Sequence, residues 1–148
     1  MRIEDEIKQK RFSSAQQKAI LNIMFTSGWM LGRLTSFFKP FGITAAQFNI
    51  LRILRGQYPN SMQVGEIKSR MLDRNSDTPR LLSRLLAKGL IEKKMCPNDR
   101  RASNVYISGS GLALLEKINR HQAELDSMLN LTDEEALLLS NLLDKARG

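Results

Sequence analysis

The segment from residue 75 to residue 108 constrains the fold of this 148-residue chain more than any other part. It begins N-S-D-T-P-R-L-L-S-R-L-L-A-K, in which leucines recur at helical spacing and basic residues occupy the other face. Gly89 follows as a helix-ending residue, and two strand-like stretches then flank the turn residues Pro97-Asn98-Asp99. The segment therefore predicts a short amphipathic helix followed by a β-hairpin, an arrangement that can reach two grooves of one duplex.

The distribution of charge favours a nucleic-acid partner. The chain carries 23 Lys and Arg against 15 Asp and Glu, a net charge of +8. Residues 52–104 hold 12 basic and 5 acidic residues, a net of +7, whereas residues 105–148 hold 4 and 7, a net of −3. A basic surface attracts phosphate through counterion release. Charge alone is equally compatible with a solvated basic face, so its coincidence with the predicted helix and hairpin is what favours DNA.

Composition argues against several other classes of protein. No apolar run approaches the ~20 residues that a membrane span needs, and the N-terminus lacks the apolar core of a signal peptide, which predicts a cytoplasmic protein. The single cysteine, Cys96, cannot form an internal disulfide. With His121 as the one histidine and no phosphate-binding glycine loop, the sequence predicts no enzyme, no metal site and no cofactor.

Apolar periodicity on the N-terminal side of the segment predicts three further helices. The first is long and ends before Pro40, because the residue before a proline is pushed out of the helical region. The second starts at a capping box, Thr44–Gln47. After the third helix, a tight turn leads to the basic helix, whose N-cap is expected at Asn75 or Ser76. Its buried stripe is expected to be Leu81, Leu82, Leu85 and Leu86.

Two more helices are predicted after the hairpin. Apolar residues from Leu112 to Leu129 indicate one long helix, and the sequence from Thr132 to Glu135 predicts a capping box for the last helix. The stripe of that helix is Leu138, Leu139, Leu142 and Leu143. We therefore expect a mainly α fold with a small β-hairpin wing: a winged helix-turn-helix flanked by N- and C-terminal helices.

The flanking helices need an apolar surface to pack against, because a winged module is self-contained. A homodimer supplies that surface, and a two-fold protein matches a two-fold DNA site. The expected organisation is an N-terminal dimerisation region at residues 1–42, a winged helix-turn-helix DNA-binding domain at 43–108 and C-terminal dimerisation helices at 109–148.

Three stretches make the chain resemble MarR-type transcriptional regulators, from about Ile20 to its end. They are R-L-L-S-R-L-L-A-K-G-L-I-E at 80–92, the wing motif Asp99-Arg100-Arg101, and I-S-G-S-G-L at 107–112. The resemblance implies an obligate dimer that binds palindromic double-stranded DNA and usually represses transcription. It also implies tuning by a small, often aromatic or phenolic, ligand or by cysteine oxidation. The alternatives are a non-specific basic nucleic-acid-binding protein and a protein-interaction module of the same fold.

Arg80 and Arg84 are the first candidates for DNA contact. They lie four residues apart outside the leucine stripe, so they either bond guanine in the major groove, with roughly 1–3 kcal/mol of discrimination, or lie on a solvated face. The resemblance breaks at Pro79, where the family often has a serine or threonine. The family's base contact is therefore not carried over to that position.

The start of the basic helix supplies further candidates. Ser76, Asp77 and Thr78 lie where free backbone N–H groups favour phosphate oxygens, and Arg74 lies in the turn before them. Asp77 is equally explained as a carboxylate that only complements the helix dipole.

The wing contributes two arginines and a cysteine. Arg100 and Arg101 either enter a narrow minor groove or belong to a charged loop. The resemblance implies that Asp99 orients an arginine by ion pairing. Cys96 is a candidate redox residue; against this, oxidation-sensing members of the family have their reactive cysteine near the N-terminus.

Three aromatic residues of the first long helix are candidates for an effector pocket near the dimer interface. The alternative for all three is ordinary core packing. They are Trp29, Phe37 and Phe38.

Overall fold

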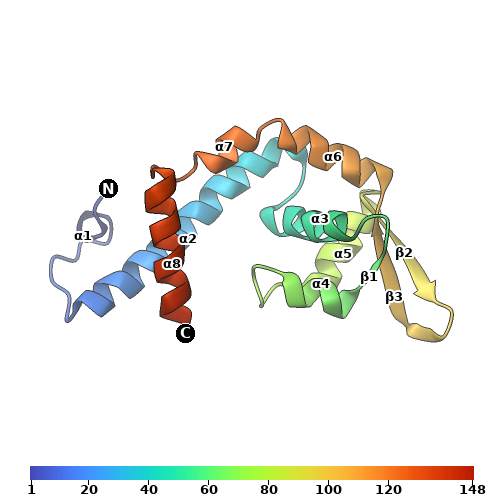
Figure 1. Ribbon diagram of the computed structural model, residues 1–148, viewed down its shortest axis with the longest axis horizontal. Helices are drawn as coiled ribbons and strands as arrows, with labels where there is room; N and C mark the ends of the chain where they lie inside the picture. Colours follow the sequence, from blue (N-terminus) through green and yellow to red (C-terminus); the bar gives the residue numbers. More distant parts are fainter. The chain divides into compact units, whose positions relative to one another are not determined.

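The computed structural model describes the backbone of residues 1–148 and every side chain except those of Arg100 and Arg101. The chain divides into two units, residues 1–116 and 117–148. The first contains α1 (Ile3–Glu6), α2 (Ala15–Phe38), the 3-10 turn η1 (Lys39–Phe41), α3 (Ala45–Gln57), β1 (Met62–Gln63), α4 (Val64–Arg70), α5 (Thr78–Ala87), β2 (Ile91–Cys96), β3 (Asp99–Ile107) and most of α6 (Gly109–Asn119) (Figure 1). The second contains α7 (Gln122–Asp126) and α8 (Asp133–Arg147). None of the described helices is both long and apolar enough to span a membrane.

Several helix ends lie where local sequence signals predicted them. Helix α2 ends at Phe38, before Pro40. At the start of α3, Gln47 N donates to Thr44 Oγ1 at 3.1 Å and Thr44 N donates to Gln47 Oε1 at 3.0 Å, which confirms the capping box. The predicted box of α8 is also present, with Thr132 N donating to the Glu135 carboxylate at 2.9 Å.

The start of α5 differs from the expectation. Its N-cap is Asp77 rather than Asn75 or Ser76, because Asp77 Oδ1 accepts a hydrogen bond from the backbone N–H of Arg80 at 3.2 Å. The preceding turn is organised by Asp73, whose Oδ1 accepts from Asn75 N at 2.9 Å. The helix therefore begins only after that turn is complete.

The buried stripe of α5 is also narrower than predicted. Leu82 and Leu85 are 3% and 0% exposed, whereas Leu81 is half-buried and Leu86 is 44% exposed. Helical spacing places Thr78, four residues before Leu82 and seven before Leu85, at the centre of the same face. Leu81 and Leu86 consequently lie at the two edges of the contact with α3 and α4.

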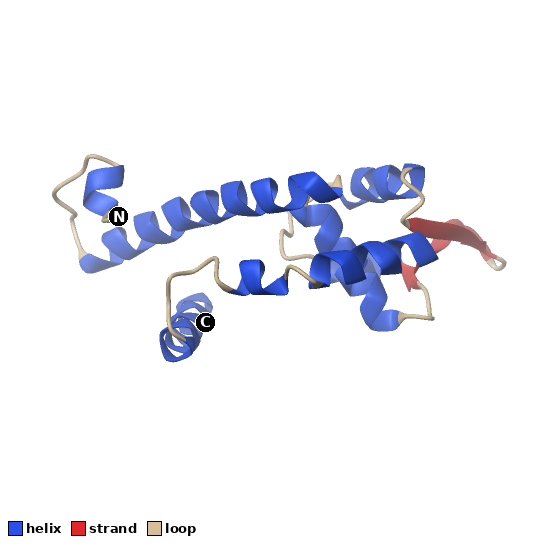
Figure 2. Ribbon diagram, turned by 90° about the horizontal axis from the view of Figure 1, so that it is seen from above, coloured by secondary structure: helices blue, strands red, loops and turns tan.

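The wing is a three-stranded antiparallel sheet in the order β1-β3-β2, where the sequence predicted a two-stranded hairpin. Figure 2 shows the strands of the wing in red. The additional strand, β1, has only two residues and pairs Met62 with Val105 and Gln63 with Asn104. Alternation of apolar and polar residues cannot be recognised over two residues, so this strand could not be predicted from the sequence. Met62 is nevertheless 2% exposed, so β1 joins the wing to the core.

The two long wing strands change register near the tip. They pair regularly from Ile91 opposite Ile107 to Met95 opposite Ser103, and then Cys96 pairs with Asp99. Residues 100–102 are therefore an insertion on β3 between two paired positions.

The prediction of a single long helix at residues 112–129 is wrong. The chain forms α6 and α7, separated at residues 120–121, where His121 adopts φ −104° and ψ 17°. Ile118 before the break and Met128 after it are both buried, at 1% and 7% exposure, so apolar periodicity continues across a break that neither glycine nor proline marks.

A buried hydroxyl joins the wing to the end of α5. Gly89 ends the helix with φ +70°, and its carbonyl accepts a hydrogen bond from Ser108 Oγ at 2.7 Å. Ser108 Oγ in turn accepts from Gly111 N at 3.0 Å, and Ser108 N donates to Leu90 O at 3.1 Å. Helix α5, both long wing strands and α6 therefore meet at one hydrogen-bonded junction.

Gly111 is required at this junction by close approach. A Cβ at this position would clash with the Leu90 carbonyl oxygen and would lie 2.8 Å from Ile107 Cγ1. We expect Gly111→Ala to lower the free energy of unfolding by about 1–3 kcal/mol, because the added methyl group meets backbone that cannot rotate away. The measurement is urea denaturation followed by circular dichroism. Gly109→Ala is the matched control, with nothing within 4 Å of its Cβ, and an equal loss in both variants would contradict the steric explanation.

Candidate nucleic-acid interface

Arg80 and Arg84 form the centre of the candidate interface. Both side chains are exposed on α5, four residues apart, on the face turned away from the core. Among the described residues, neither guanidinium has an ion-pair partner. Two free arginines on one face of a helix provide forked N–H donors that match guanine edges and phosphates.

The turn before α5 is held by its own polar side chains. Arg74 Nη1 donates to the Ser69 carbonyl at the end of α4, at 2.6 Å, and Ser76 Oγ donates to Asp73 O at 2.8 Å. An arginine has five N–H donors, so Arg74 keeps donors for a phosphate, whereas the single hydroxyl hydrogen of Ser76 is already donated to Asp73. The turn is thus ordered before any ligand binds.

Asp77 and Thr78 are placed differently from the other predicted residues. The Asp77 carboxylate caps the N-terminus of α5, which supports the helix-capping alternative. The Thr78 side chain is 0% exposed, and its Oγ1 has no hydrogen-bond partner among the described atoms. The structure therefore does not bring the Thr78 hydroxyl to the surface with Arg80. Its helical phase relative to Leu82 and Leu85 was the sequence signal for this burial.

The wing extends the basic surface. The side chains of Arg100 and Arg101 lie outside the described residues, while Asp99 is exposed at the start of β3. Lys93 and Lys94 of β2 are also exposed, and they were not among the DNA contacts predicted from the sequence. The sequence signal that could have identified these lysines is their position in the predicted strand that leads into the wing turn.

Two residues of the two long wing strands interact across the sheet. The half-buried Cys96 directs its Sγ toward Asn104 Oδ1 at 3.5 Å, a weak thiol hydrogen bond. The structure describes no group of His, Cys, Asp and Glu that could hold a metal ion.

The three aromatic residues proposed for an effector pocket separate into two environments. Phe38 is 1% exposed, and its ring centroid lies 4.6 Å from that of Phe48 on α3 and 5.0 Å from that of Phe37. Phe38 thus belongs to the core, with Phe37 packed edge-on against it. Trp29, in contrast, lines a pocket between α1 and α2.

Comparisons with known proteins place this geometry in context. Residues 43–103 match the sequence profile of the MarR family. The multiple antibiotic resistance protein MarR of Salmonella typhimurium is 31% identical over 115 residues, which cover 76% of this chain and 78% of that protein. A crystal structure of a mutant MarR from Escherichia coli in complex with operator DNA has a TM-score of 0.71 at 28% identity, covering 84% of this chain and 89% of that one. A MarR-like regulator from Bacillus cereus shares the fold, with a TM-score of 0.76 at 20% identity over 89% of this chain and 95% of that one.

The buried hydroxyl of Thr78 gives a direct test of this residue's role. We expect Thr78→Val to raise the free energy of unfolding by about 1–2 kcal/mol, because a buried hydroxyl without a partner is replaced by a methyl group of similar shape. Affinity for duplex DNA should be unchanged. Thermal denaturation and a DNA-binding titration measure the two effects. The control Thr78→Ser keeps the hydroxyl and loses the methyl group, so it should have a lower free energy of unfolding. If Thr78→Val bound DNA more weakly, the conclusion that Thr78 does not contact DNA would be wrong.

Proposed function

Because the chain belongs to the MarR family of DNA-binding transcriptional regulators, we propose that it represses transcription as a homodimer on a palindromic operator. Members of this family are not enzymes, which confirms that prediction from the sequence. We assign DNA binding to residues 43–108, and dimerisation to residues 1–42 and 109–148. A small effector that changes operator affinity is part of the same proposal.

The main observation behind the proposal is that two exposed arginines of α5 have no ion-pair partner among the described residues. In a winged helix-turn-helix the second helix of the motif enters the major groove, which is the position of α5 after α4. Arg80 and Arg84 are then the base and phosphate contacts of that helix, and the wing residues Arg100 and Arg101 enter the adjacent minor groove. The junction at Ser108 supports this assignment because it fixes the wing relative to α5.

Exposed apolar side chains support the homodimer. On α2, four large apolar residues are between 47% and 67% exposed: Ile20, Ile23, Met24 and Leu31. On α8, Leu138 and Leu142 are 59% and 55% exposed, one helical turn apart. Clusters of this kind on helices mark surfaces that another protein covers. A second copy of the chain presents the same surfaces, as a two-fold interface requires.

Arginine substitutions test the DNA contacts. A duplex selected from a random pool supplies the operator. Arg80→Ala should weaken binding to it and relax base preference at one position, with roughly 1–3 kcal/mol of lost discrimination. Arg101→Ala should weaken binding to all duplexes and reduce its salt dependence, because a backbone and groove contact is lost. Fluorescence anisotropy at fixed salt measures both.

Arg120→Ala is the control for the change in net charge, since this exposed residue lies outside residues 43–108. Unchanged binding by both Arg80→Ala and Arg101→Ala would refute the assigned contacts. Failure to recover any enriched palindrome would instead favour a non-specific basic nucleic-acid-binding protein.

The dimer is tested on α8. Leu138→Asp together with Leu142→Asp should weaken self-association at least about a hundredfold, because each protomer loses two apolar side chains from the interface and gains two charges. Light scattering and sedimentation over a range of concentrations measure the change. Ser140→Asp adds a charge to the same helix away from the leucine stripe, so it should remain a dimer. A monomeric unmodified protein at micromolar concentration would contradict the proposal.

A further inference from the structure

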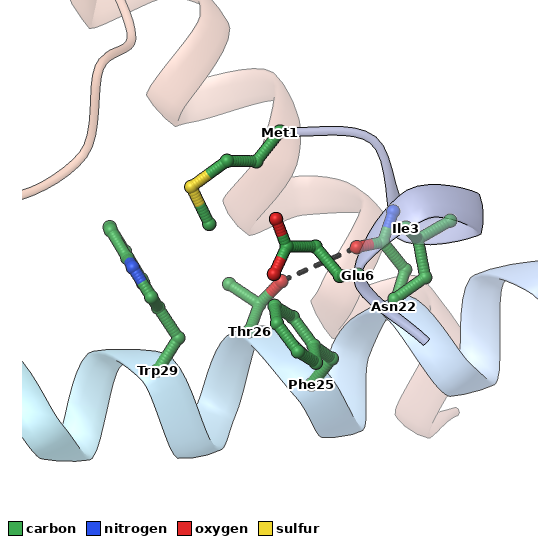
Figure 3. A pocket seen from close by; sticks show the side chains of 7 residues that line it. All are labelled: Met1, Ile3, Glu6, Asn22, Phe25, Thr26 and Trp29. Carbon is green, nitrogen blue, oxygen red and sulfur yellow. Dashed lines mark hydrogen bonds between the residues drawn. The ribbon is translucent and has the colours of Figure 1, made fainter. Parts of the chain in front are cut away.

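A pocket of about 210 Å³ lies between α1 and α2 within the first unit (Figure 3). Its walls include the Phe25 and Trp29 rings of α2 and the Met1 and Ile3 side chains at the N-terminus. Asn22 and Thr26 of α2 and Glu6 of α1 complete the lining. A cavity of ~150 Å³ holds a benzene molecule, so this volume accommodates one ring with a short substituent.

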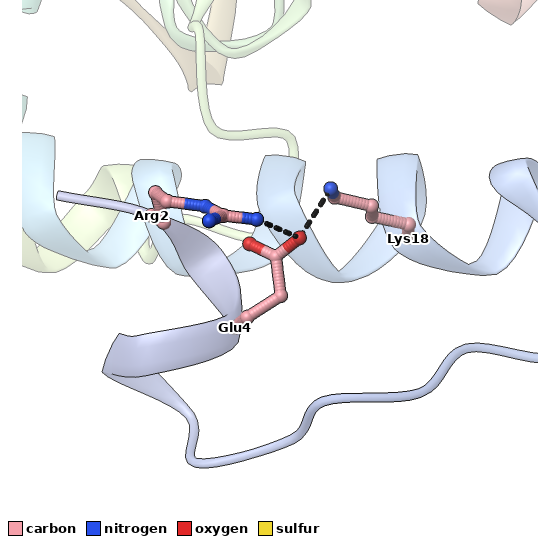
Figure 4. A network of polar contacts seen from close by, with 3 residues as sticks. All are labelled: Arg2, Glu4 and Lys18. Atoms are coloured by element: carbon pink, nitrogen blue, oxygen red, sulfur yellow. Dashed lines mark hydrogen bonds and ion pairs between the residues drawn. The ribbon is translucent and has the colours of Figure 1, made fainter.

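The short helix α1 is held against α2 by an ionic contact that does not involve the pocket's own carboxylate. Lys18 Nζ donates to Glu4 Oε1 at 2.5 Å, and Arg2 reaches the same oxygen at 3.4 Å (Figure 4). The hydrogen bond from Lys18, followed by one from the backbone N–H of Glu4 itself, holds the pKa of Glu4 at about 2. Ile3, 5% exposed, adds apolar contact beside this ion pair. The α1 side of the pocket is therefore anchored.

Glu6 is the only ionisable side chain among the seven residues that line the pocket, and its carboxylate points toward the space between Met1, Thr26 and Trp29 (Figure 3). Within the described part of the chain it has no ion-pair partner. Thr26 Oγ1 donates a hydrogen bond to Asn22 Oδ1, at 3.4 Å, and so does not engage the Glu6 carboxylate. A carboxylate without a partner beside two aromatic rings favours a ligand that combines positive charge with apolar surface.

We propose that this pocket binds a small arylalkylamine, with its ammonium group on Glu6 and its ring against Phe25 and Trp29. The Arg33 guanidinium already lies 5.0 Å from the Trp29 ring centroid. The ammonium group is therefore assigned to the carboxylate, and the indole contributes apolar surface.

The pocket and the exposed apolar residues of α2 lie on different faces of that helix. Asn22, Phe25 and Trp29 recur at intervals of three and four residues, which defines one face. At 3.6 residues per turn, Ile20, Met24 and Leu31 fall roughly on the opposite face. A second copy bound to those residues would leave the pocket face of α2 uncovered. The binding proposal is therefore independent of the proposed repressor function.

Trp29 is the only tryptophan of the chain, so its indole N–H and its fluorescence report directly on the pocket. The experiment titrates the full chain, without DNA, with three probes of similar size and different charge: benzylamine, benzyl alcohol and benzoate. Benzylamine should shift the Trp29 indole resonance and bind about threefold to tenfold more tightly than benzyl alcohol, with benzoate weakest.

Glu6→Gln should remove the preference for benzylamine over benzyl alcohol. Asp5→Asn removes the same charge from α1 outside the pocket lining, so it should retain the preference. The proposal is overturned by any of three results: no Trp29 response to any probe, equal affinities for the three probes, or a benzylamine preference that survives Glu6→Gln. None of these results depends on whether the protein binds an operator.

Discussion

The buried hydroxyl of Ser108 holds together the parts that a winged DNA-binding module must keep in fixed relation. It donates to the carbonyl of Gly89, just after the end of α5, and accepts from the backbone N–H of Gly111 in the first turn of α6. In the proposed complex α5 and the wing enter adjacent grooves of one duplex, so an error in the angle between them would cost contacts in one groove or the other. The glycines on either side follow from this constraint: Gly89 supplies a left-handed turn, and Gly111 allows the backbone of α6 to approach Leu90.

The features predictable from the sequence are those whose causes lie within about four residues. Pro40 ends α2, the Thr44–Gln47 box starts α3, and Gly89 ends α5, because capping and backbone restriction act locally. The amphipathic pattern of α5 also placed Arg80 and Arg84 on the outer face, since a 3.6-residue period is a local property. The order of the helices and strands from α2 to α5 and through the β2–β3 hairpin, apart from β1, and the exposure of Arg80 and Arg84 could therefore be predicted from the sequence.

The features that sequence reasoning missed depend on distant parts of the chain. The two residues of β1 become a strand only because β3 passes beside them. The break between α6 and α7 leaves no mark in the apolar pattern, as residues on both sides of it are buried. Thr78 is the most instructive case, because its spacing from Leu82 and Leu85 indicated burial while its polar character suggested the surface. Periodicity was the better guide there, even though the buried hydroxyl has no partner among the described atoms.

Charge and apolar surface are distributed so that the proposed dimer and the proposed DNA contacts do not compete. The segment of residues 52–104 carries a net charge of +7, and two such segments repel one another in the absence of a polyanion. The exposed leucines of α8 lie instead in residues 105–148, where the net charge is −3 and the first turn of α8 is acidic. Association through α8 would therefore bring together the weakly acidic segments of two chains. The strongly basic segments would stay accessible to the phosphates of DNA. In the proposed complex, DNA supplies the negative charge between the two basic segments, so that dimerisation and DNA binding favour one another.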